Sequence, residues 1–506
     1  MKAVLNFSLS GKADSRQTGT FTVPAACKQL SLTCDLETKY GFLVFVILKD
    51  SQNHVRLPKQ LGTNEQVLTV GPDALNTTIG GIPGEIITGE WTLEVSLFAE
   101  HIERLIGKKE IPFHFTVSDE DVKCTEPIGE SLWADMDFSY TGFDSRRVYR
   151  QGARWYKGDL HTHTRLSDGK ELPENASRKA EMMHLDYYIA TEHNVVHSGG
   201  PNTDVCIMPG VEATTILGHA NIFGLTKRPE ELERLLYDKE EALLAEDMLA
   251  LSDTCRKNGW LFSINHPFLY IWQWLMEEFA LDRVDCLEII NDPTYAADEM
   301  AGAEKANRMA VALADLLWAD GYRICAIGGS DSHNLIEERY GDATEPSIPG
   351  DPATWLHLHD LTPEHVTEAL KDCRCYVTRH CRMVSEFKVC GEDSIMKKIR
   401  FGEKMPEDAV ALLYEITLFD CTEKACFYMM VNGEKRRLQS VQTSGHSYTV
   451  QGLTHLQKKD WCCIRFGAET EDGSFLFFGN PMTKGSRTHA FLTMGEAMEH
   501  VRKAWK

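Results

Sequence analysis

Apolar and polar residues alternate over the first quarter of this 506-residue chain. In Glu90–Leu97 and Phe113–Val117 every second residue is apolar, which puts the apolar side chains on one face of a strand. Turn-forming residues such as Gly80–Gly84 separate these short segments. We therefore expect a β-sandwich-like domain over residues 1–125 and a connecting segment over 126–155.

Between residues 156 and 383, short apolar strands alternate with longer segments of helical spacing. The expected strands are Gly158–Thr162, Asp186–Thr191, Val205–Val211, His219–Leu225, Trp260–Asn265, Cys286–Asn291, Ile324–Gly328 and Cys375–Thr378. The expected helices are Pro173–His184, Pro229–Lys257, Asp298–Asp320 and Pro363–Lys371. This alternation predicts an α/β domain with parallel strands, built either as a barrel or as a doubly wound sheet. Residues 384–506 return to strand-like spacing, so we expect a C-terminal β-rich domain with a last helix at Met494–Lys503.

The composition narrows the choice of partners. The chain has 53 basic and 75 acidic residues, a net charge of −22, which argues against a surface for nucleic acid or anionic membrane. It has neither a secretion-type N-terminal segment nor an apolar run of roughly 18 residues. Its fifteen cysteines are scattered, as free thiols in a reducing compartment would be. We expect a cytoplasmic protein that acts on a small molecule; its oligomeric state is left open.

Two histidines and an aspartate follow the first expected strand of the α/β domain. Side chains two residues apart on a strand share a face, so His161 and His163 can reach one ion together. Asp168 follows in a Ser-Asp-Gly turn that can bring its carboxylate back to the same place. Imidazole and carboxylate together favour zinc, manganese or iron over calcium or magnesium.

Further polar residues stand at the carboxyl ends of the other strands, where the ligands of parallel α/β domains collect. They are Glu192, His193, Glu212, His219, His266, Asp331 and His333. Taken singly, each has an ordinary reading as a turn residue, a helix cap or a surface histidine. Because metal-ligand types recur at successive strand ends, we predict a metal centre, with Glu192 as a supporting residue and not a ligand.

The motifs also resemble those of a known family. Asp-Leu-His-Thr-His-Thr with Ser-Asp-Gly, Thr-Glu-His-Asn, Gly-Val-Glu, Gly-His, Asn-His-Pro and Gly-Ser-Asp-Ser-His stand in the order seen in the PHP (polymerase and histidinol phosphatase) superfamily of metal-dependent hydrolases. Within it, the chain resembles the CehA/McbA-like group over residues 155–383. The resemblance implies a distorted (β/α)7 barrel that the two β domains flank, with two or three Mn, Zn or Fe ions.

The resemblance also assigns the ligands. It implies one ion on His161, His163, Glu212 and Asp331, a second on Glu212, His219 and His266, and a third on Asp168, His193 and His333. Many relatives have a histidine where this chain has Asp168, a difference that three-metal members of the group share. Catalysis is expected to depend on Glu212, Asp331 and His193.

The expected reaction is hydrolysis of a phosphate monoester or diester by a hydroxide that bridges two ions. The sequence contains no Gly-x-Ser-x-Gly elbow, Walker loop or dinucleotide fingerprint. Two alternatives stay open: hydrolysis of a carbamate or an aryl ester at the same site, and a metal-binding scaffold without activity. Phe268–Trp274 and Asn334–Pro352 are candidates to cover the site. Arg165, Lys170, Arg379 and His380 are candidates to contact the substrate, or else surface charges.

Overall fold

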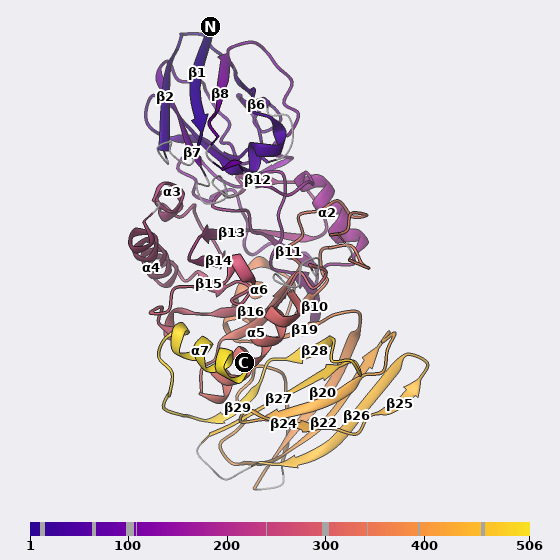
Figure 1. Ribbon diagram of the computed structural model, residues 1–506. Helices are drawn as coiled ribbons and strands as arrows, with labels where there is room; N and C mark the ends of the chain where they lie inside the picture. The colour runs from indigo at the N-terminus through magenta and orange to yellow at the C-terminus, as the bar shows by residue number, and fades with distance from the viewer. Residues whose placement is uncertain are drawn as a thin grey trace.

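We describe the protein from a computed structural model, which places three regions in chain order (Figure 1). It describes residues 1–505 except 11–15, 63–66, 98–105, 108, 239, 296–302, 342, 393–394 and 457–460. Parts of two expected helices, Lys239 and Asp298–Gly302, lie outside the described residues, as does Asp342 of the segment Asn334–Pro352. Among the helices of the described residues, none has the length and apolar character that crossing a membrane requires.

The N-terminal region is a sandwich of two antiparallel sheets. One sheet has the order β1 (Lys2–Leu9), β8 (Ile111–Ser118), β3 (Leu30–Cys34) and β6 (Val67–Val70). The other has the order β2 (Arg16–Val23), β7 (Gly89–Leu97), β4 (Val44–Lys49) and β5 (Val55–Gln60). Alternate residues of both sheets, such as Trp91, Leu93, Phe113 and Phe115, fill one buried core between them.

The central region is a curled sheet of mixed direction. Its strands lie in the order β17 (Cys325–Gly329), β16 (Cys286–Asn291), β15 (Leu261–Ile264), β14 (Gly218–Phe223), β13 (Cys206–Thr215), β11 (Tyr187–Ala190) and β10 (Arg154–Asp159). Neighbours pair in parallel except that β14 runs antiparallel to both β13 and β15. The helices of this region are α2 (Pro173–Met182), α3 (Glu231–Tyr237), α4 (Glu241–Asn258), α5 (Ala303–Ala319) and α6 (Pro363–Lys371).

The family resemblance implies a distorted (β/α)7 barrel, and a sevenfold β/α repeat is not present in the described residues of this sheet. β13 and β14 are joined by a tight hairpin at Ile216–Leu217, and so short a connection makes neighbouring strands antiparallel. No helix of the described residues separates β11 from β13; that connection carries only β12 (Gly199–Gly200), which pairs with β9 (Ser131–Leu132). The helix expected over Pro229–Lys257 is divided into α3 and α4, because the backbone at Asp238 is extended.

The curled sheet closes where β17 meets the chain beyond β10. Thr162 and Ser332 form a parallel bridge, and the Asp331 amide donates a hydrogen bond to the His161 carbonyl at 2.8 Å. Farther along β17, side chains close the gap. Thr354 Oγ1 accepts from the Gly328 amide at 2.9 Å and donates to its carbonyl at 2.7 Å. The strand ends of β10 and β17 are therefore fixed next to each other.

The C-terminal region continues the central sheet. β10 pairs with β18 (Ala353–Leu358) and β18 with β19 (Cys375–Thr378); the sheet then passes to β28 (Phe475–Gly479), β27 (Trp461–Glu469), β23 (Cys426–Val431) and β24 (Glu434–Arg437), with β29 (Met482–Gly485) also on β27. A second sheet has the order β21 (Met396–Ile399), β20 (Arg382–Gly391), β22 (Ala409–Phe419), β26 (Ser447–His455) and β25 (Val441–Ser444). The last helix, α7 (Met494–Ala504), packs on α5 and has a Thr493–Glu496 capping box.

Asn480 joins the C-terminal region to β17. Its buried side chain accepts from the Ala326 amide at 2.8 Å and donates to the Ala326 carbonyl at 2.8 Å and to the Cys375 carbonyl at 3.2 Å. One amide group thus completes the backbone hydrogen bonding of β17 where no strand pairs with it among the described residues.

Asn480→Ala should lower the free energy of unfolding by about 1–3 kcal/mol, because it leaves the buried Ala326 amide without a partner and the Ala326 carbonyl with only the weak Cys375 thiol donor at 3.5 Å. Urea unfolding monitored by circular dichroism measures this change. The matched control is Asn258→Ala on the exposed end of α4, which should change stability by less than about 0.5 kcal/mol. Equal stability of the two variants would contradict the role of Asn480.

Candidate metal centre

All nine expected metal ligands converge at one rim of the curled sheet. His161, His163 and Asp168 follow β10; His193 follows β11; Glu212 lies on β13 and His219 on β14; His266 follows β15; Asp331 and His333 follow β17. The closure of β17 onto the chain beyond β10 brings the first and last of these groups together. The convergence expected from the sequence is therefore present, although the sheet is of mixed direction.

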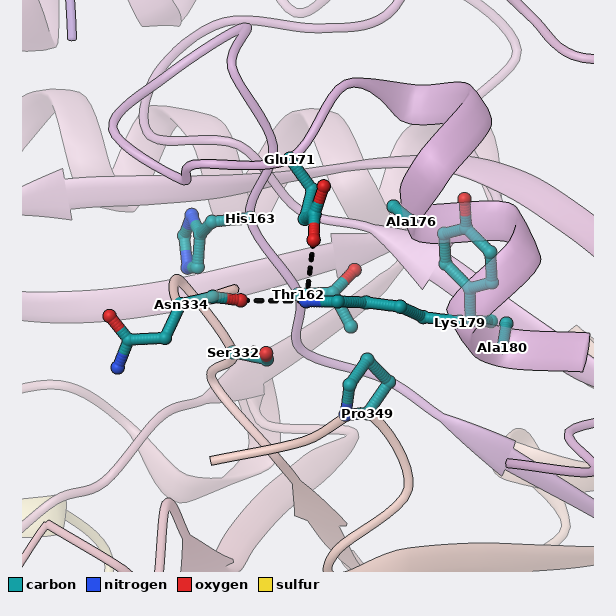
Figure 2. A pocket seen from close by; sticks show the side chains of 10 residues that line it. Thr162, His163, Glu171, Ala176, Lys179, Ala180, Ser332, Asn334 and Pro349 are labelled. Carbon is teal, nitrogen blue, oxygen red and sulfur yellow. Dashed lines mark hydrogen bonds and ion pairs between the residues drawn. The ribbon is translucent and has the colours of Figure 1, made fainter. Parts of the chain in front are cut away.

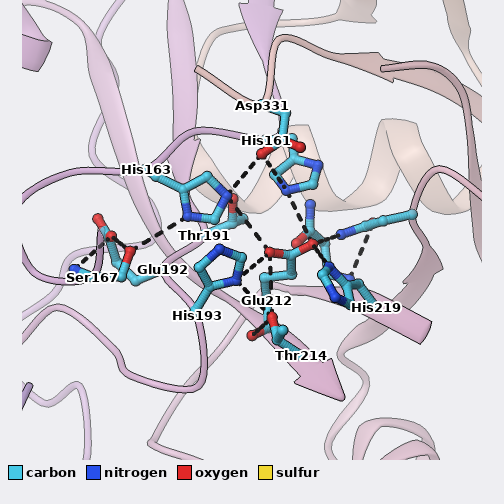
Figure 3. A network of polar contacts seen from close by, with 12 residues as sticks. His161, His163, Ser167, Thr191, Glu192, His193, Glu212, Thr214, His219 and Asp331 are labelled. Carbon is cyan, nitrogen blue, oxygen red and sulfur yellow. Dashed lines mark hydrogen bonds and ion pairs between the residues drawn. The ribbon is translucent and has the colours of Figure 1, made fainter. Parts of the chain in front are cut away.

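Glu212 is at the centre of the cluster (Figure 3). Its carboxylate oxygens lie within 3.6 Å of ring nitrogens from five histidines: His161, His163, His193, His219 and His266. The shortest contact, 2.7 Å, joins Glu212 Oε2 to His193 Nδ1, and 3.1 Å separate Oε1 from His219 Nδ1. Asn265 Nδ2 donates to Oε1 at 2.8 Å and fixes the carboxylate further.

Asp331 faces the two histidines of the first motif from the opposite side. Its Oδ1 lies 3.0 Å from His163 Nε2 and 3.3 Å from His161 Nε2. His161, His163 and Glu212 form a set of nitrogen and oxygen atoms close enough to hold one ion, and Asp331 lies next to this set. A second such set combines His193, Glu212 and His219, and His266 Nε2 lies 3.5 Å from Glu212 Oε1 beside it.

A third set of possible ligands gathers around Asp168. Its Oδ1 lies 3.3 Å from His333 Nε2 and 3.5 Å from His193 Nε2, and His163 belongs to the same set. The three sets share His163, His193 and Glu212. These sets differ in three ways from those that the family resemblance implies. Asp331 lies beside the first set but is not part of it, His193 takes the place expected for His266 beside Glu212, and His163 also belongs to the third set.

The polar atoms of the cluster fit a metal centre. His161 Nε2, His163 Nε2, His266 Nδ1, Asp168 Oδ1 and Asp331 Oδ1 are buried without a hydrogen-bond partner. Several lie 3.0–3.6 Å from an oppositely charged group, but without hydrogen-bond geometry. Buried polar atoms without partners are rare and costly, and here they point at one another. Divalent ions would satisfy them together.

The backbone at the rim is strained at two of the nine positions. His266 and Asp331 have φ values of +25° and +50°, which non-glycine residues rarely adopt. Such conformations persist where the surrounding structure fixes them, and they cluster at functional sites. Here the His266 amide donates to Glu288 Oε2 at 2.9 Å, and the Asp331 amide donates to the His161 carbonyl.

Glu288, which the sequence prediction missed, supports His161 from behind. Glu288 Oε1 lies 2.9 Å from His161 Nδ1, so it can hold a proton there and leave Nε2 free to face an ion. Gly329 allows this approach, because a Cβ on Gly329 would lie 2.4 Å from His161 Cβ and 2.5 Å from Glu288 Oε1. The signal in the sequence is a carboxylate inside the apolar strand Cys286–Asn291, where it needs a partner.

Glu192 supports the loop after His163. It accepts hydrogen bonds from the Thr164 amide at 3.0 Å, the Ser167 amide at 3.2 Å and His197 Nε2 at 2.7 Å, as well as from both hydroxyl groups of Thr164 and Ser167. Burial raises the pKa of Glu192, but these hydrogen bonds outweigh it and lower the pKa to about 2. The oxygens of Glu192 are thus taken up by hydrogen bonds to groups that belong to none of the three ligand sets, as its expected supporting role requires.

The loop that carries His333 is held by a buried lysine of α2. Lys179 Nζ donates to the Asn334 carbonyl at 2.7 Å and lies 3.1 Å from Glu171 Oε1 (Figure 2). Burial lowers the pKa of Lys179, which Glu171 opposes. The contact ties the chain just after His333 to α2.

Opposite charges decide the ionisation of the cluster. Burial would lower the pKa of His333, but Asp168 and Asp331 outweigh it and raise that pKa to about 10. Burial and the neighbouring His333 and His193 lower the pKa of His163 to about 4. Burial would raise the pKa of Glu212, but the imidazoles around it hold that pKa well below its usual range. Carboxylates at the centre therefore stay ionised.

A cavity of about 290 Å³ opens over the cluster. Its floor includes Asp168, His193, His219, His266, Asp331 and His333, and its other lining residues are Leu269, Trp272, Asn291, Asp292, Tyr295, Asn334 and Tyr340. Three aromatic rings form one wall: Tyr295 makes edge contacts with Trp272 at 5.8 Å and with Tyr340 at 5.1 Å. The two segments expected to cover the site thus contribute Trp272 and Tyr340. Trp274, by contrast, is buried in the core.

The four expected substrate contacts do not line this cavity. Each of them faces a carboxylate: Arg165 lies 3.3 Å from Glu126, Lys170 2.7 Å from Glu338, Arg379 2.7 Å and His380 3.1 Å from Glu345. Three of these four basic residues pair with a carboxylate of the loop after His333. The sequence does not show where that loop lies, so it could not reveal these pairs. None of the described residues that line the cavity is a lysine or an arginine.

Comparisons with known proteins give weak similarities. No family model matches the chain, and no curated protein matches its sequence. A two-domain protein from Bacteroides vulgatus, described as containing a predicted PHP-like metal-dependent phosphoesterase, shares 15% identity with a TM-score of 0.34, covering 66% of this chain and 96% of that one. A protein from Bifidobacterium adolescentis, suggested to be a metal-dependent phosphoesterase, shares 13% identity with a TM-score of 0.24, covering 37% and 92%. At these TM-scores neither similarity establishes the fold or the function of this chain.

Glu212→Gln should remove metal from the cluster, because Glu212 contributes to two of the three ligand sets. We expect the bound metal to fall by at least one ion per chain, measured by mass spectrometry of the metals after dialysis. The control is Glu469→Gln, which alters a carboxylate 2.8 Å from Lys435 and outside the possible ligand sets, and should leave the metal content unchanged. Wild-type metal content in Glu212→Gln would refute the assignment.

Metal binding should release protons and strengthen as the pH rises. Burial would lower the pKa values of His161 and His333, but nearby carboxylates outweigh it and raise them, so both are largely protonated near neutral pH and must lose a proton to bind an ion. Because the pKa of His333 is about 10, apparent affinity for Mn²⁺ should increase from about pH 6 to about pH 9. Calorimetric titration in two buffers of different ionisation enthalpy measures the released protons. Affinity independent of pH would contradict this description.

Proposed function

We propose that this protein is a metal-dependent hydrolase of the PHP type that cleaves a phosphate monoester or diester. The observation that carries the proposal is the Glu212 carboxylate, buried among five imidazoles, with further ligand atoms around it that lack hydrogen bonds. Structural histidines and carboxylates of a protein core satisfy one another; these do not. The order of the sequence motifs supports the same conclusion.

Each residue of the site has a separate part in this function. When bound, two or three divalent ions supply Lewis acidity and an activated water near neutral pH, so no serine or cysteine nucleophile is needed. Glu212 and Asp331 hold negative charge at the centre, while Glu288 and Thr214 orient the rings of His161 and His193. The cavity admits substrate on the side where Asp168, His333 and His219 are partly or fully accessible to it.

The number of ions bears on the charge of the substrate. Four carboxylates, those of Asp168, Glu212, Glu288 and Asp331, lie in or directly behind the cluster. Their charge balances that of two divalent ions, so only a third ion would leave the site positive. A phosphate ester is an anion and gains most from that third ion. The proposed phosphoesterase activity therefore depends on the ligand set around Asp168.

A second candidate function is hydrolysis of a carbamate or a carboxylic ester. It is favoured by the cavity wall, where Trp272, Tyr295 and Tyr340 meet and where no lysine or arginine is present among the described lining residues. Burial and the charge of Asp331 raise the pKa of Asp292 in this wall to about 7, so this carboxyl is partly ionised near neutral pH and would repel an anion. A neutral substrate would suit a site with two ions.

A substrate panel separates the two functions. We expect the manganese- or zinc-loaded protein to cleave p-nitrophenyl phosphate or bis-p-nitrophenyl phosphate. Glu212→Gln should lower that rate by more than roughly 100-fold, because replacing even a residue that only supports a metal ligand lowers activity about 10–100-fold. Release of p-nitrophenol measures the rate, and Glu469→Gln, outside the possible ligand sets, is the control that should keep the wild-type rate. Cleavage of aryl carbamates alone would replace the first function by the second. A metal-loaded protein that cleaves none of these esters would refute both.

A further inference from the structure

The segment that carries Asp168 lies between the N-terminal sandwich and the metal cluster. We call residues 164–170 the Asp168 loop. On its inner side, Glu192 accepts hydrogen bonds from Thr164 and Ser167. On its outer side, the loop meets the end of β5 and the residues after it, which belong to the sandwich. Its position therefore depends on two parts of the chain far apart in sequence.

Backbone groups of the Asp168 loop are bound by the sandwich at successive residues. Lys59 Nζ donates to the Arg165 carbonyl, and the Gln60 amide donates to the Leu166 carbonyl at 3.2 Å. Gly62 follows with a positive φ of 64°, and a Cβ there would lie 3.0 Å from the Ser167 carbonyl oxygen. The chain of the sandwich thus runs along the loop in direct contact, up to the residue before Asp168.

An apolar contact holds the same loop. Leu166 is completely buried in a small cluster with Phe45 and Ile47 of β4, Ile79 of the sandwich and Val195 of the central region. This cluster is separate from the main cores of the two regions. The loop is therefore packed as well as hydrogen-bonded against the sandwich, and burial of one leucine contributes about 1.5–3 kcal/mol.

Lys59 is the polar centre of this contact. Its side chain is fully buried, and Nζ lies 3.3 Å from Glu126 Oε2, while Glu126 Oε1 lies 3.3 Å from Arg165 Nη1. Burial lowers the pKa of Lys59, which Glu126 opposes. A buried ion pair of this kind contributes little net stability compared with an apolar pair, but it fixes the geometry of the groups it binds. The group fixed here is the backbone three residues before Asp168.

We infer that the N-terminal sandwich is a working part of the metal centre, with Lys59 as the positioning residue that holds Asp168 against His193 and His333. The inference rests on the proposed function, because it assigns the sandwich to the ligand set on which cleavage of an anionic ester depends. The His333 side of that set is held by Lys179 within the central region (Figure 2). The Asp168 side is held both by the central region, through Glu192 and a 2.8 Å hydrogen bond from the Lys170 amide to the His333 carbonyl, and by the sandwich, through Lys59 and Gln60.

Lys59→Met in the full-length protein tests the inference. We expect one ion fewer per chain at limiting Mn²⁺, or an affinity for the weakest-bound ion lowered about 10–100-fold, with the other ions retained. Amide hydrogen exchange of residues 164–170 should be faster in the metal-free variant. Lys59→Arg, which keeps the charge and a donor, should recover part of both properties. Phosphate ester cleavage should fall more than carbamate cleavage.

The matched control is Lys49→Met. Lys49 is also buried where the sandwich meets the central region, 3.0 Å from Glu233 of α3, but it does not touch the Asp168 loop. Its variant should keep wild-type metal content and loop exchange, and similar unfolding midpoints of both variants show that Lys59→Met is folded. Wild-type metal binding or wild-type loop exchange in Lys59→Met would overturn the inference. A wild-type protein that binds ions but cleaves no ester would overturn the proposed function alone.

Discussion

The rest of the structure depends on one buried charge, the carboxylate of Glu212. A carboxylate without accessible surface is expensive unless opposite charges and hydrogen-bond donors surround it. Five imidazoles from four other strand ends and the Asn265 amide meet this requirement. Those side chains can converge only if the sheet curls until β17 reaches the chain beyond β10. The candidate metal centre therefore depends on the curvature of the sheet.

Both flanking regions act on the rim where these side chains lie. The C-terminal region completes β17 through Asn480, and β17 leads directly to Asp331 and His333. The N-terminal sandwich holds the Asp168 loop through Lys59, Gln60 and the Leu166 cluster. Each β region therefore supports the chain that carries part of one set of possible metal ligands.

The sequence predicted the local features of this protein better than its long-range ones. The strand Cys286–Asn291 and the helix Pro363–Lys371 have the expected bounds, because local apolar spacing decides them. The nine candidate ligands come together because polar residues at strand ends reach a common rim. The sequence pattern did not reveal that β14 runs antiparallel to its neighbours, because that direction depends on the short hairpin at Ile216–Leu217. Glu288 and Lys59 were missed because their partners lie more than one hundred residues away.

Measuring how many ions bind, and where, is the most direct test of whether Glu212 is the centre of a metal site. Crystals of the manganese-loaded protein, with anomalous diffraction measured on both sides of the manganese edge, give both. We expect two anomalous peaks next to the carboxylate of Glu212, one on the side of His161 and His163 and the other on the side of His219. A further peak should lie beside Asp168. Density at none of these places, in a protein whose rim residues are ordered, would contradict this expectation.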